Sequence, residues 1–411
     1  AYSTIREGNQ GEPLYNKDKK EWRKWFPVDF ITESFPGQFK NWFYALIAES
    51  TVLENEPPFK RVLGFGTQLG EDGRPMHKSW GNAIEFNEGA DKIGVDVMRW
   101  MFARHNPADN MLFGFKKADE VRRQFYLMLW NVYKFFVEYA NLDKWSGHPQ
   151  GGFYVSGHPK GVLDKWILSR FTGLVISVEK DLKEYSAKDA AIEIEKFVSD
   201  LSTWYIRRSR DRVWVNSENS EDKNNFYETL HHILVNLSII ISPFIPFVAE
   251  EIYTNLTGKE SVNLENWPFD SGSTSLTIAQ GKSVINEKLE QDMEIARKVV
   301  EAGQAERKAA GMKIRIPLAN LKLKTELTTN FKSISSEVWD VVLKELNIKN
   351  ITINDKFHYP EKEVKVTDSQ LEKEGKLREL IREIQSIRKL KGLKTDQKID
   401  LTIPKNFEKE K

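Results

Sequence analysis

The 411-residue sequence contains no cysteine. Disulfide bonds, thiolate-held zinc and a cysteine nucleophile are therefore excluded from this chain. Its seven histidines show no HExxH or related spacing, so we do not expect a histidine metal site either. The formal net charge of +1 provides no general field that attracts polyanions. Any nucleic-acid site must then be a local basic patch.

Long apolar runs are also scarce. The run that could be either a membrane span or a buried helix is residues 233–249, "ILVNLSIIISPFIPFVA". As a membrane span this run would be at the short limit, and it contains Asn236 and two prolines. We therefore predict a buried helix that ends at the Ser242-Pro243 step. The chain begins without a basic and then apolar leader, so we expect a cytoplasmic protein with no membrane association.

The remaining composition is that of a globular protein, with 40% hydrophobic and 29% charged residues. Its length allows two or three domains. Within residues 1–105 we predict a strand running into a turn at 61–70 and a helix at 96–104. From 115 to 255, apolar residues recur at steps of three and four, which predicts long helices that form a bundle. A Gly/Pro-rich connection at 146–161 interrupts them.

The pattern changes after a Gly/Ser-rich linker at residues 270–277. Helices and strands are then expected in alternation: a helix at 286–311, a strand at 314–324, a helix at 336–346, a strand at 348–353, a helix at 368–390 and a last strand near 398–403. This order predicts a small α/β domain.

One loop combines turn-forming residues with a cation: "GRPMHKSWGN", residues 73–82. Gly73 and Gly81 favour turns, while Lys78 and Ser79 offer an ammonium group and a hydroxyl. Loops of this kind hold phosphates when the ammonium and the loop donors close on an anion. An ordinary surface turn has the same composition, and the loop residues alone leave both interpretations open.

The stretch "PMHKSWGN" resembles the KMSKS loop of class I aminoacyl-tRNA synthetases. Met76, Lys78 and Ser79 keep their places in that motif, while Pro75 replaces its first lysine and His77 its first serine. Three other stretches resemble parts of isoleucyl-tRNA synthetases, and all the matches occur in the same order as in that family. They are "DFITESFPGQFKNWF" (29–43), "LSTWYIRRSRDRVW" (201–214) and "ARKVVEAGQAERKAAGMKIRIPLANL" (296–321). The resemblance covers nearly the whole chain.

The resemblance implies that the loop of Met76, His77, Lys78 and Ser79 binds ATP, which is accompanied by Mg²⁺. Amino-acid activation displaces pyrophosphate from ATP, and negative charge builds on the leaving oxygens. Lys78 is the implied catalytic residue, because a lysine that closes on those oxygens stabilises the transition state more than the ground state. A mobile loop suits this role, since it also permits product release.

The segment 29–43 is similar to one wall of the family's aminoacyl-adenylate pocket, with Glu33, Gln38 and Trp42 at the family-like positions. A carboxylate can accept hydrogen bonds from ribose hydroxyls or a substrate ammonium, an amide can donate or accept, and a Trp face can bound an aliphatic side chain. Gly37 stands where the family usually has an acidic residue. The residues alone also permit a purely structural interpretation. Trp42 would then be a core aromatic residue, and Glu33 would be a solvated residue at the end of a strand.

The segment 201–214 concentrates positive charge, opposed only by Asp211, in four arginines within six residues: Arg207, Arg208, Arg210 and Arg212. The planar fork of arginine suits phosphate, and the resemblance implies that this helix as a whole contacts tRNA. A solvated, salt-bridged face is the alternative. Three aromatic residues of the same segment are expected to pack in the core: Trp204, Tyr205 and Trp214.

We therefore expect a mainly α protein with α/β parts. Residues 1–105 would form a partial Rossmann-type catalytic domain, 106–269 a helical anticodon-binding domain, and 270–411 a linker with a C-terminal α/β domain. No HxGH motif is found, so we expect the C-terminal part of an enzyme that charges tRNA(Ile) with isoleucine, inactive without its N-terminal half. A noncatalytic tRNA-binding protein and a valyl or leucyl enzyme remain the alternatives.

Overall fold

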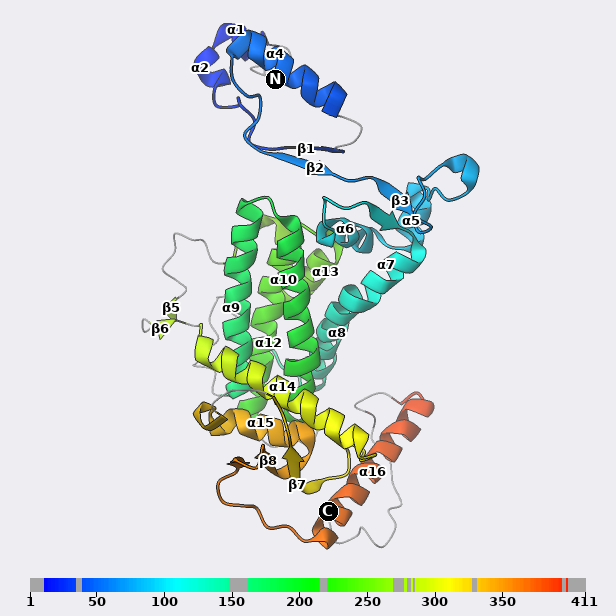
Figure 1. Ribbon diagram of the computed structural model, residues 1–411, viewed down its shortest axis with the longest axis vertical. Coiled ribbons are helices and arrows are strands. Elements are labelled where there is room, and N and C mark those ends of the chain that lie inside the picture. The colour runs from blue at the N-terminus through cyan, green and yellow to red at the C-terminus, as the bar shows by residue number, and fades with distance from the viewer. Residues whose placement is uncertain are drawn as a thin grey trace. The chain divides into compact units, whose positions relative to one another are not determined.

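The computed structural model describes residues 11–34, 39–147, 161–214, 220–268, 277–278, 282–283, 285–326, 331–393 and 397. The chain forms two compact units, each made of several segments. The first comprises Ala1–Leu127, Val178–Glu193 and Pro243–Val248, and the second comprises Met128–Ser177, Ile194–Ser242 and Ala249–Lys411. Figure 1 labels their helices and strands.

The first unit begins with short elements around a small aromatic core. These are α1 (Leu14–Lys17), α2 (Lys19–Trp22), β1 (Ile31–Ser34), the π-helical turn η1 (Phe39–Phe43), α4 (Tyr44–Glu54) and β2 (Val62–Phe65). Trp22 stacks on Phe26 with ring centroids 4.5 Å apart, and Leu14 completes the cluster. Strands β1 and β2 are parallel and joined through α4. This βαβ arrangement confirms the α/β character expected of a Rossmann-type part.

The rest of the first unit contains a second parallel pair of strands. Its elements are β3 (Gln68–Gly70), the 3₁₀ turn η2 (Lys78–Trp80), α5 (Phe86–Lys92), α6 (Val95–Arg104), β4 (Met111–Phe113), α7 (Phe115–Val121) and the π-helical turn η3 (Arg122–Tyr126). Buried Trp100 of α6 stacks on Phe125. Strand β2 and helix α6 confirm two predictions, whereas the turn expected before residue 70 is β3, which pairs with β4.

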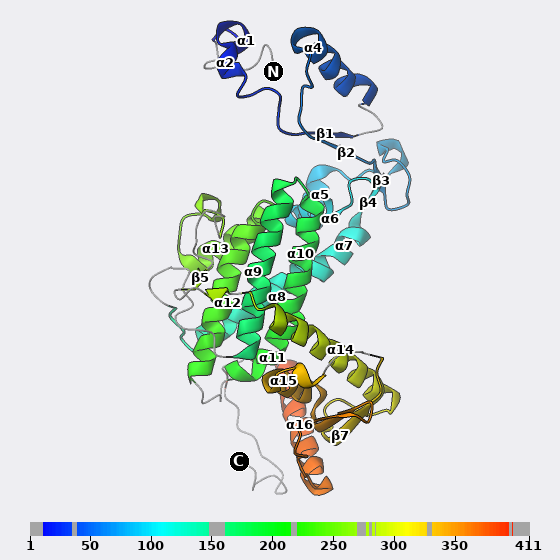
Figure 2. The same ribbon diagram turned by 60° about the vertical axis from the view of Figure 1, so that its left-hand side comes forward.

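The predicted helical bundle is present and combines long helices with short helical turns. They are α8 (Leu127–Leu142), α9 (Val162–Lys183), α10 (Ala187–Ser199), the π-helical turn η4 (Asp200–Ile206), α11 (Arg207–Ser209), the 3₁₀ turn η5 (Arg210–Val213), α12 (Ser220–Ile241), α13 (Pro246–Thr257) and the 3₁₀ turn η6 (Val262–Leu264). Figures 1 and 2 show α9, α10 and α12 side by side. Phe171, Phe197 and Phe226 are almost completely buried between them, as the apolar spacing predicted.

The apolar run at 233–249 is the end of a buried helix followed by a turn. Helix α12 ends at Ile241, and Ile240, Ile241 and Ile245 have no exposed surface. The prediction of a helix that stops at the Ser242-Pro243 step is therefore confirmed. Within the part of the chain that the structure describes, no helix combines the length and apolarity needed to cross a bilayer.

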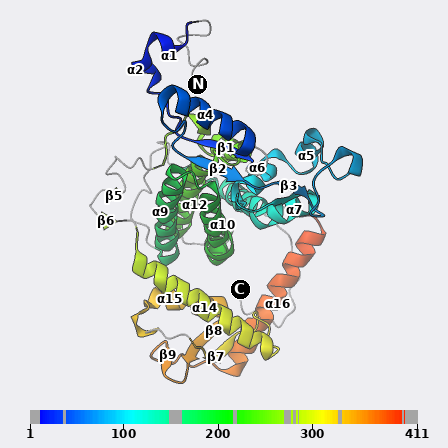
Figure 3. The ribbon, with the colours of Figure 1, turned by 45° about the horizontal axis from the view of Figure 1, so that its top comes forward.

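The C-terminal α/β part also agrees with the predicted element order. It contains β5 (Thr277–Ile278), β6 (Lys282–Ser283), α14 (Glu287–Ala309), β7 (Leu318–Leu323), the 3₁₀ turn η8 (Phe331–Ser333), α15 (Ser336–Leu346), β8 (Ile348–Ile353), β9 (Phe357–Tyr359) and α16 (Asp368–Leu390). Strand β8 runs parallel to β7 and antiparallel to β9, a short strand that the sequence did not predict. Figure 3 shows α14 and α15 together beside these strands.

Helices α14 and α15 approach closely because α14 carries Gly303 at their contact. A Cβ atom at Gly303 would lie 2.7 Å from the Cδ1 atom of Leu346. The strand predicted near 398–403 lies outside the described residues, as do most residues of the connections at 146–161 and 270–277.

Candidate phosphate loop and basic helix

The loop at residues 73–82 leaves β3 through a tight turn and is closed by one side chain. The Gly70 N–H donates to the Arg74 carbonyl at 2.9 Å, and Gly73 adopts a positive φ of 76°. The Asn82 side chain accepts the His77 N–H at 2.9 Å and donates to the Pro75 carbonyl at 3.0 Å. These bonds tie the two ends of the loop together.

Lys78 lies at the start of η2, on the exposed tip of this loop. Its ammonium group has neither an ion pair nor a hydrogen bond within the described residues. The His77 ring lies 4.4 Å from the Trp80 ring, and the Gln68 amide points at the Met76 sulfur from 4.0 Å. The loop therefore has a defined backbone but presents a free cation, which is the arrangement needed to accept an anion.

The residues of the predicted adenylate wall lie on β1 and on η1. Glu33 is half-buried beside Gly64 of β2, and its carboxylate accepts the Ser34 N–H at 2.9 Å. Trp42 is 39% exposed, with its ring 5.6 Å from that of Phe43. Gln38 lies outside the described residues. No hydrogen bond or ring contact joins Glu33, Trp42 and Lys78 in the described part of this unit.

The four arginines of the basic segment have different environments. Arg212 is 13% exposed and makes two hydrogen bonds of 2.7 Å to the carboxylate of Asp164, which is fully buried. Asp222 accepts from the Arg212 Nε atom at 3.0 Å, and the Tyr205 hydroxyl donates to Asp164 at 2.7 Å. The buried Asp164 carboxylate, with a smaller contribution from Asp222, raises the pKa of Arg212, so it is a structural cation that joins α9, η5 and α12.

Arg207 and Arg208 both pair with Glu345 of α15. The Glu345 side chain is 3% exposed and also accepts from the Gln304 amide of α14 at 3.1 Å. Arg208 is 16% exposed, and burial lowers its pKa to about 10, which leaves it charged at neutral pH. Arg207 remains 52% exposed, and Arg210 is exposed. Of the four guanidinium groups, only those of Arg207 and Arg210 are largely accessible to solvent.

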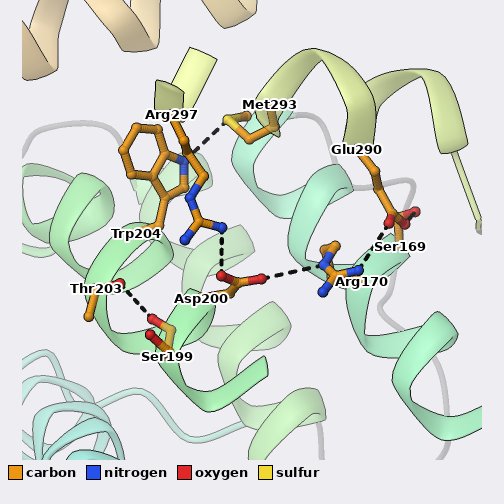
Figure 4. A network of polar contacts seen from close by, with 9 residues as sticks. All are labelled: Ser169, Arg170, Ser199, Asp200, Thr203, Trp204, Glu290, Met293 and Arg297. Carbon is orange, nitrogen blue, oxygen red and sulfur yellow. Dashed lines mark hydrogen bonds and ion pairs between the residues drawn. The ribbon is translucent and has the colours of Figure 1, made fainter. Parts of the chain in front are cut away.

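A second polar cluster joins η4 to α9 and α14, and Figure 4 shows it. Asp200 is buried and accepts from Arg297 of α14 at 2.6 Å, while Arg170 of α9 lies 3.4 Å away. Arg170 also pairs with Glu290 at 3.3 Å. The Trp204 N–H donates to the Met293 sulfur at 3.2 Å. The basic segment is therefore anchored on both sides by side chains of α9 and α14.

The aromatic residues of the basic segment follow the prediction in two cases out of three. Trp204 is 7% exposed and Tyr205 has no exposed surface, which confirms core packing. Trp214 is 43% exposed, so that prediction was wrong. The 3₁₀ turn ends at Val213, and Trp214 adopts an extended conformation that directs the chain out of the helix.

Two family models match this chain. The model for "tRNA synthetases class I (I, L, M and V)" matches residues 4–113, which include the loop at residues 73–82. The model for "Anticodon-binding domain of tRNA ligase" matches residues 164–323, which include the basic segment and α14. Both parts of the candidate site thus lie inside matched regions.

Two curated relatives agree with these models. An isoleucine–tRNA ligase from Dehalococcoides mccartyi is 37% identical over 388 residues, which cover 89% of this chain and 37% of that protein. One from Bacillus thuringiensis is 38% identical over 361 residues, covering 87% of this chain and 32% of that protein. A solved structure of Mycobacterium tuberculosis methionyl-tRNA synthetase bound by methionyl-adenylate has a TM-score of 0.47 and 19% identity, covering 58% of this chain and 46% of that chain.

The chain thus spans about a third of the length of the curated relatives it matches. The matches to isoleucine–tRNA ligases take in 87–89% of this chain, so they reach beyond the residues that the two family models match. Over this third, the chain is thus similar to class I tRNA synthetases and, among them, to isoleucine–tRNA ligases.

Proposed function

We propose that this chain is part of a cytoplasmic enzyme that charges tRNA(Ile) with isoleucine at the expense of ATP. The observation that carries the proposal is the 37–38% identity to isoleucine–tRNA ligases over 87–89% of the chain. ATP is a substrate in this reaction and brings Mg²⁺ with it. In the described residues, no group of three or more Asp, Glu or His side chains is arranged to hold a metal ion.

Lys78 is proposed to act on the phosphates of ATP. Its free ammonium group at the tip of a loop closed by Asn82 supports this role, because the group can reach an anion without breaking an existing ion pair. Negative charge grows on the departing pyrophosphate, and a cation that meets it there lowers the barrier. Met76, His77 and Ser79 would shape the loop around that anion.

Glu33, Gln38 and Trp42 are proposed to form one wall of the aminoacyl-adenylate pocket. The half-buried Glu33 carboxylate keeps one oxygen available after accepting the Ser34 N–H. The exposed face of Trp42 is apolar and suits an aliphatic side chain such as that of isoleucine.

The basic segment is proposed to face tRNA, with its four arginines divided into two roles. Arg207 and Arg210 are accessible to phosphates, whereas Arg208 and Arg212 hold the segment in place through buried carboxylates. We also propose the domain division at residues 1–105, 106–269 and 270–411. It assigns activation to the first part and tRNA binding to the helical bundle.

The test is amino-acid-dependent pyrophosphate exchange in a completed enzyme, made by joining this chain to the N-terminal part of an isoleucine–tRNA ligase. Exchange that depends on isoleucine is expected, and exchange with valine or leucine alone would favour a valyl or leucyl enzyme. No exchange with any amino acid, together with retained tRNA binding, would favour a noncatalytic tRNA-binding protein. An in-frame HxGH motif in the upstream coding DNA would support the enzyme independently.

A further inference from the structure

Residues 311–317, "GMKIRIP", form a loop between α14 and β7 that exposes an unusual combination of side chains. We call this loop the strap. Met312, Ile314 and Ile316 are 44%, 41% and 47% exposed. Lys313 and Arg315 alternate with them along the chain. Neighbouring exposed apolar side chains of this size mark interaction surfaces more often than single ones do.

The strap is held in one shape by two side chains beneath it. The Arg307 Nη2 atom donates to the carbonyls of Lys313 and Ile316 at 2.7 and 2.6 Å. The Asn347 amide donates to the carbonyl of Ile314 at 3.0 Å. Gly311 permits the turn that leaves α14, with φ of 67°. The strap is therefore preorganised, although most of its side chains are exposed.

The buried position of Arg307 beneath the strap is energetically unfavourable. It is 2% exposed, and its Nε and Nη1 atoms are buried without a hydrogen-bond partner. No carboxylate pairs with it in the described part of the chain, and burial lowers its pKa. The negative end of the α14 dipole offsets part of this cost, because Arg307 lies in the last turn of that helix. Unfavourable groups of this kind persist in proteins mainly where the geometry they fix is used.

The sequence around the strap is also locally basic. Residues 306–317 contain four basic residues and one acidic residue, a balance of +3, whereas the whole chain has a net charge of +1. Arg315 pairs with Glu379 of α16. Lys308 and Lys313 are exposed and have no ion pair in the described residues. These two ammonium groups are free to bind an external anion.

We propose that the strap is an RNA-contacting element, in which Lys308 and Lys313 bind phosphates while Met312, Ile314 and Ile316 pack on sugars and bases. The identity of the ligand rests on the proposed tRNA function. Lysine is depleted in protein–protein interfaces but is a regular phosphate ligand, so the free charges favour RNA over an acidic protein. A nearly neutral protein needs such a patch for RNA, because its overall charge supplies no attraction.

The experiment measures the affinity of the whole chain for a tRNA(Ile) transcript across a series of KCl concentrations. The double variant Lys308→Gln/Lys313→Gln should bind roughly tenfold more weakly at moderate salt. Its slope of log affinity against log salt should fall by about 1.4, the effect of two lost phosphate contacts. The double variant Met312→Ser/Ile314→Ser should weaken binding with no change in slope, because apolar contacts release no counterions.

The matched control is Lys356→Gln/Lys362→Gln, which removes the same charge from two other exposed positions of the C-terminal part. If the strap variant and this control bind RNA alike, the strap proposal is overturned while tRNA binding stands. If the unchanged chain binds no RNA at any salt concentration, the strap proposal and the proposed tRNA binding are both overturned. Binding of an acidic protein by the strap, with RNA affinity unaffected, would also overturn the proposal.

A second measurement tests the role of Arg307 as a positioning residue. The variant Arg307→Met keeps the helix but leaves the carbonyls of Lys313 and Ile316 without their donor. We expect faster trypsin cleavage after Lys313 and Arg315, and weaker RNA binding with little change in salt slope, because no phosphate contact is removed. Unchanged cleavage and unchanged affinity would show that the strap does not depend on Arg307.

Discussion

The pair of Arg212 and Asp164 gives the sharpest quantitative prediction about this protein. Asp164 has no exposed surface, and both of its oxygens are bonded to Arg212 at 2.7 Å. Replacing Arg212 with Leu leaves this carboxylate buried with, among the described residues, only the Tyr205 hydroxyl as a donor. Breaking a buried pair from one side costs about 3–5 kcal/mol, because the remaining charge is not compensated.

The assay is thermal unfolding of the whole chain, followed by circular dichroism of its helices. For a helical part of this size, about 3–5 kcal/mol corresponds to a decrease in Tm of roughly 6–20 °C. The double variant Asp164→Leu/Arg212→Leu removes both charges and should recover most of the loss. The control Arg210→Leu changes an exposed arginine of the same segment and should shift Tm by no more than about 1–2 °C.

The reasoning would be refuted by a single variant that unfolds within about 2 °C of the unchanged chain. It would equally fail if the double variant were less stable than Arg212→Leu alone. Either outcome would mean that water or a rearranged neighbour compensates Asp164, so that Arg212 is not the side chain that makes its burial tolerable.

Three further predictions concern catalysis, RNA binding and pH. In a completed enzyme, Lys78→Ala should slow adenylate formation about 10²–10³-fold in pyrophosphate exchange, while isoleucine binding without ATP stays unchanged. Arg207→Gln/Arg210→Gln should weaken tRNA binding and flatten its salt dependence, whereas equal affinity and slope would place the contacts elsewhere. Burial lowers the pKa of His232 to about 4, below the usual 6.5, so stability present above pH 6.5 should be lost as the pH falls toward 4. The shift from 6.5 to about 4 sets an upper limit of roughly 3 kcal/mol on this loss, and His232→Gln should remove that part of the pH dependence in urea titrations.

Local sequence signals were sufficient for the long helices of the bundle and for most elements of the C-terminal part, but not for the short strands. The bounds of α15, β8 and α16 agree with the predicted ranges to the residue, because each boundary carries a recognisable residue. Ser335 caps α15, and Asn347 ends it with a left-handed φ of 51°. Thr367 and Gln370 form a capping box at the start of α16. Strand β9 was missed because three residues are too few to show an alternating pattern.

The environment of the basic segment could not be predicted in the same way. The sequence shows four arginines with the same local appearance, but their partners lie far away along the chain. Asp164 is 48 residues from Arg212, and Glu345 is on a helix of another predicted domain. The π-helical turn η4 was also invisible, since its apolar spacing resembles that of an α-helix over seven residues.

Pairing therefore decides which cations of this chain can act on a ligand. Arg208 and Arg212 have the residue type and position expected of phosphate ligands, yet their charges are already compensated by buried carboxylates. An RNA phosphate would have to replace those carboxylates and leave them buried and unpaired, at a cost that exceeds the gain of one surface contact. Lysines without partners bear no such cost. Because the tip of the loop at residues 73–82 and the strap carry cations of this kind in the described residues, mutations there should change ligand affinity, whereas mutations of Arg208 and Arg212 should change stability first.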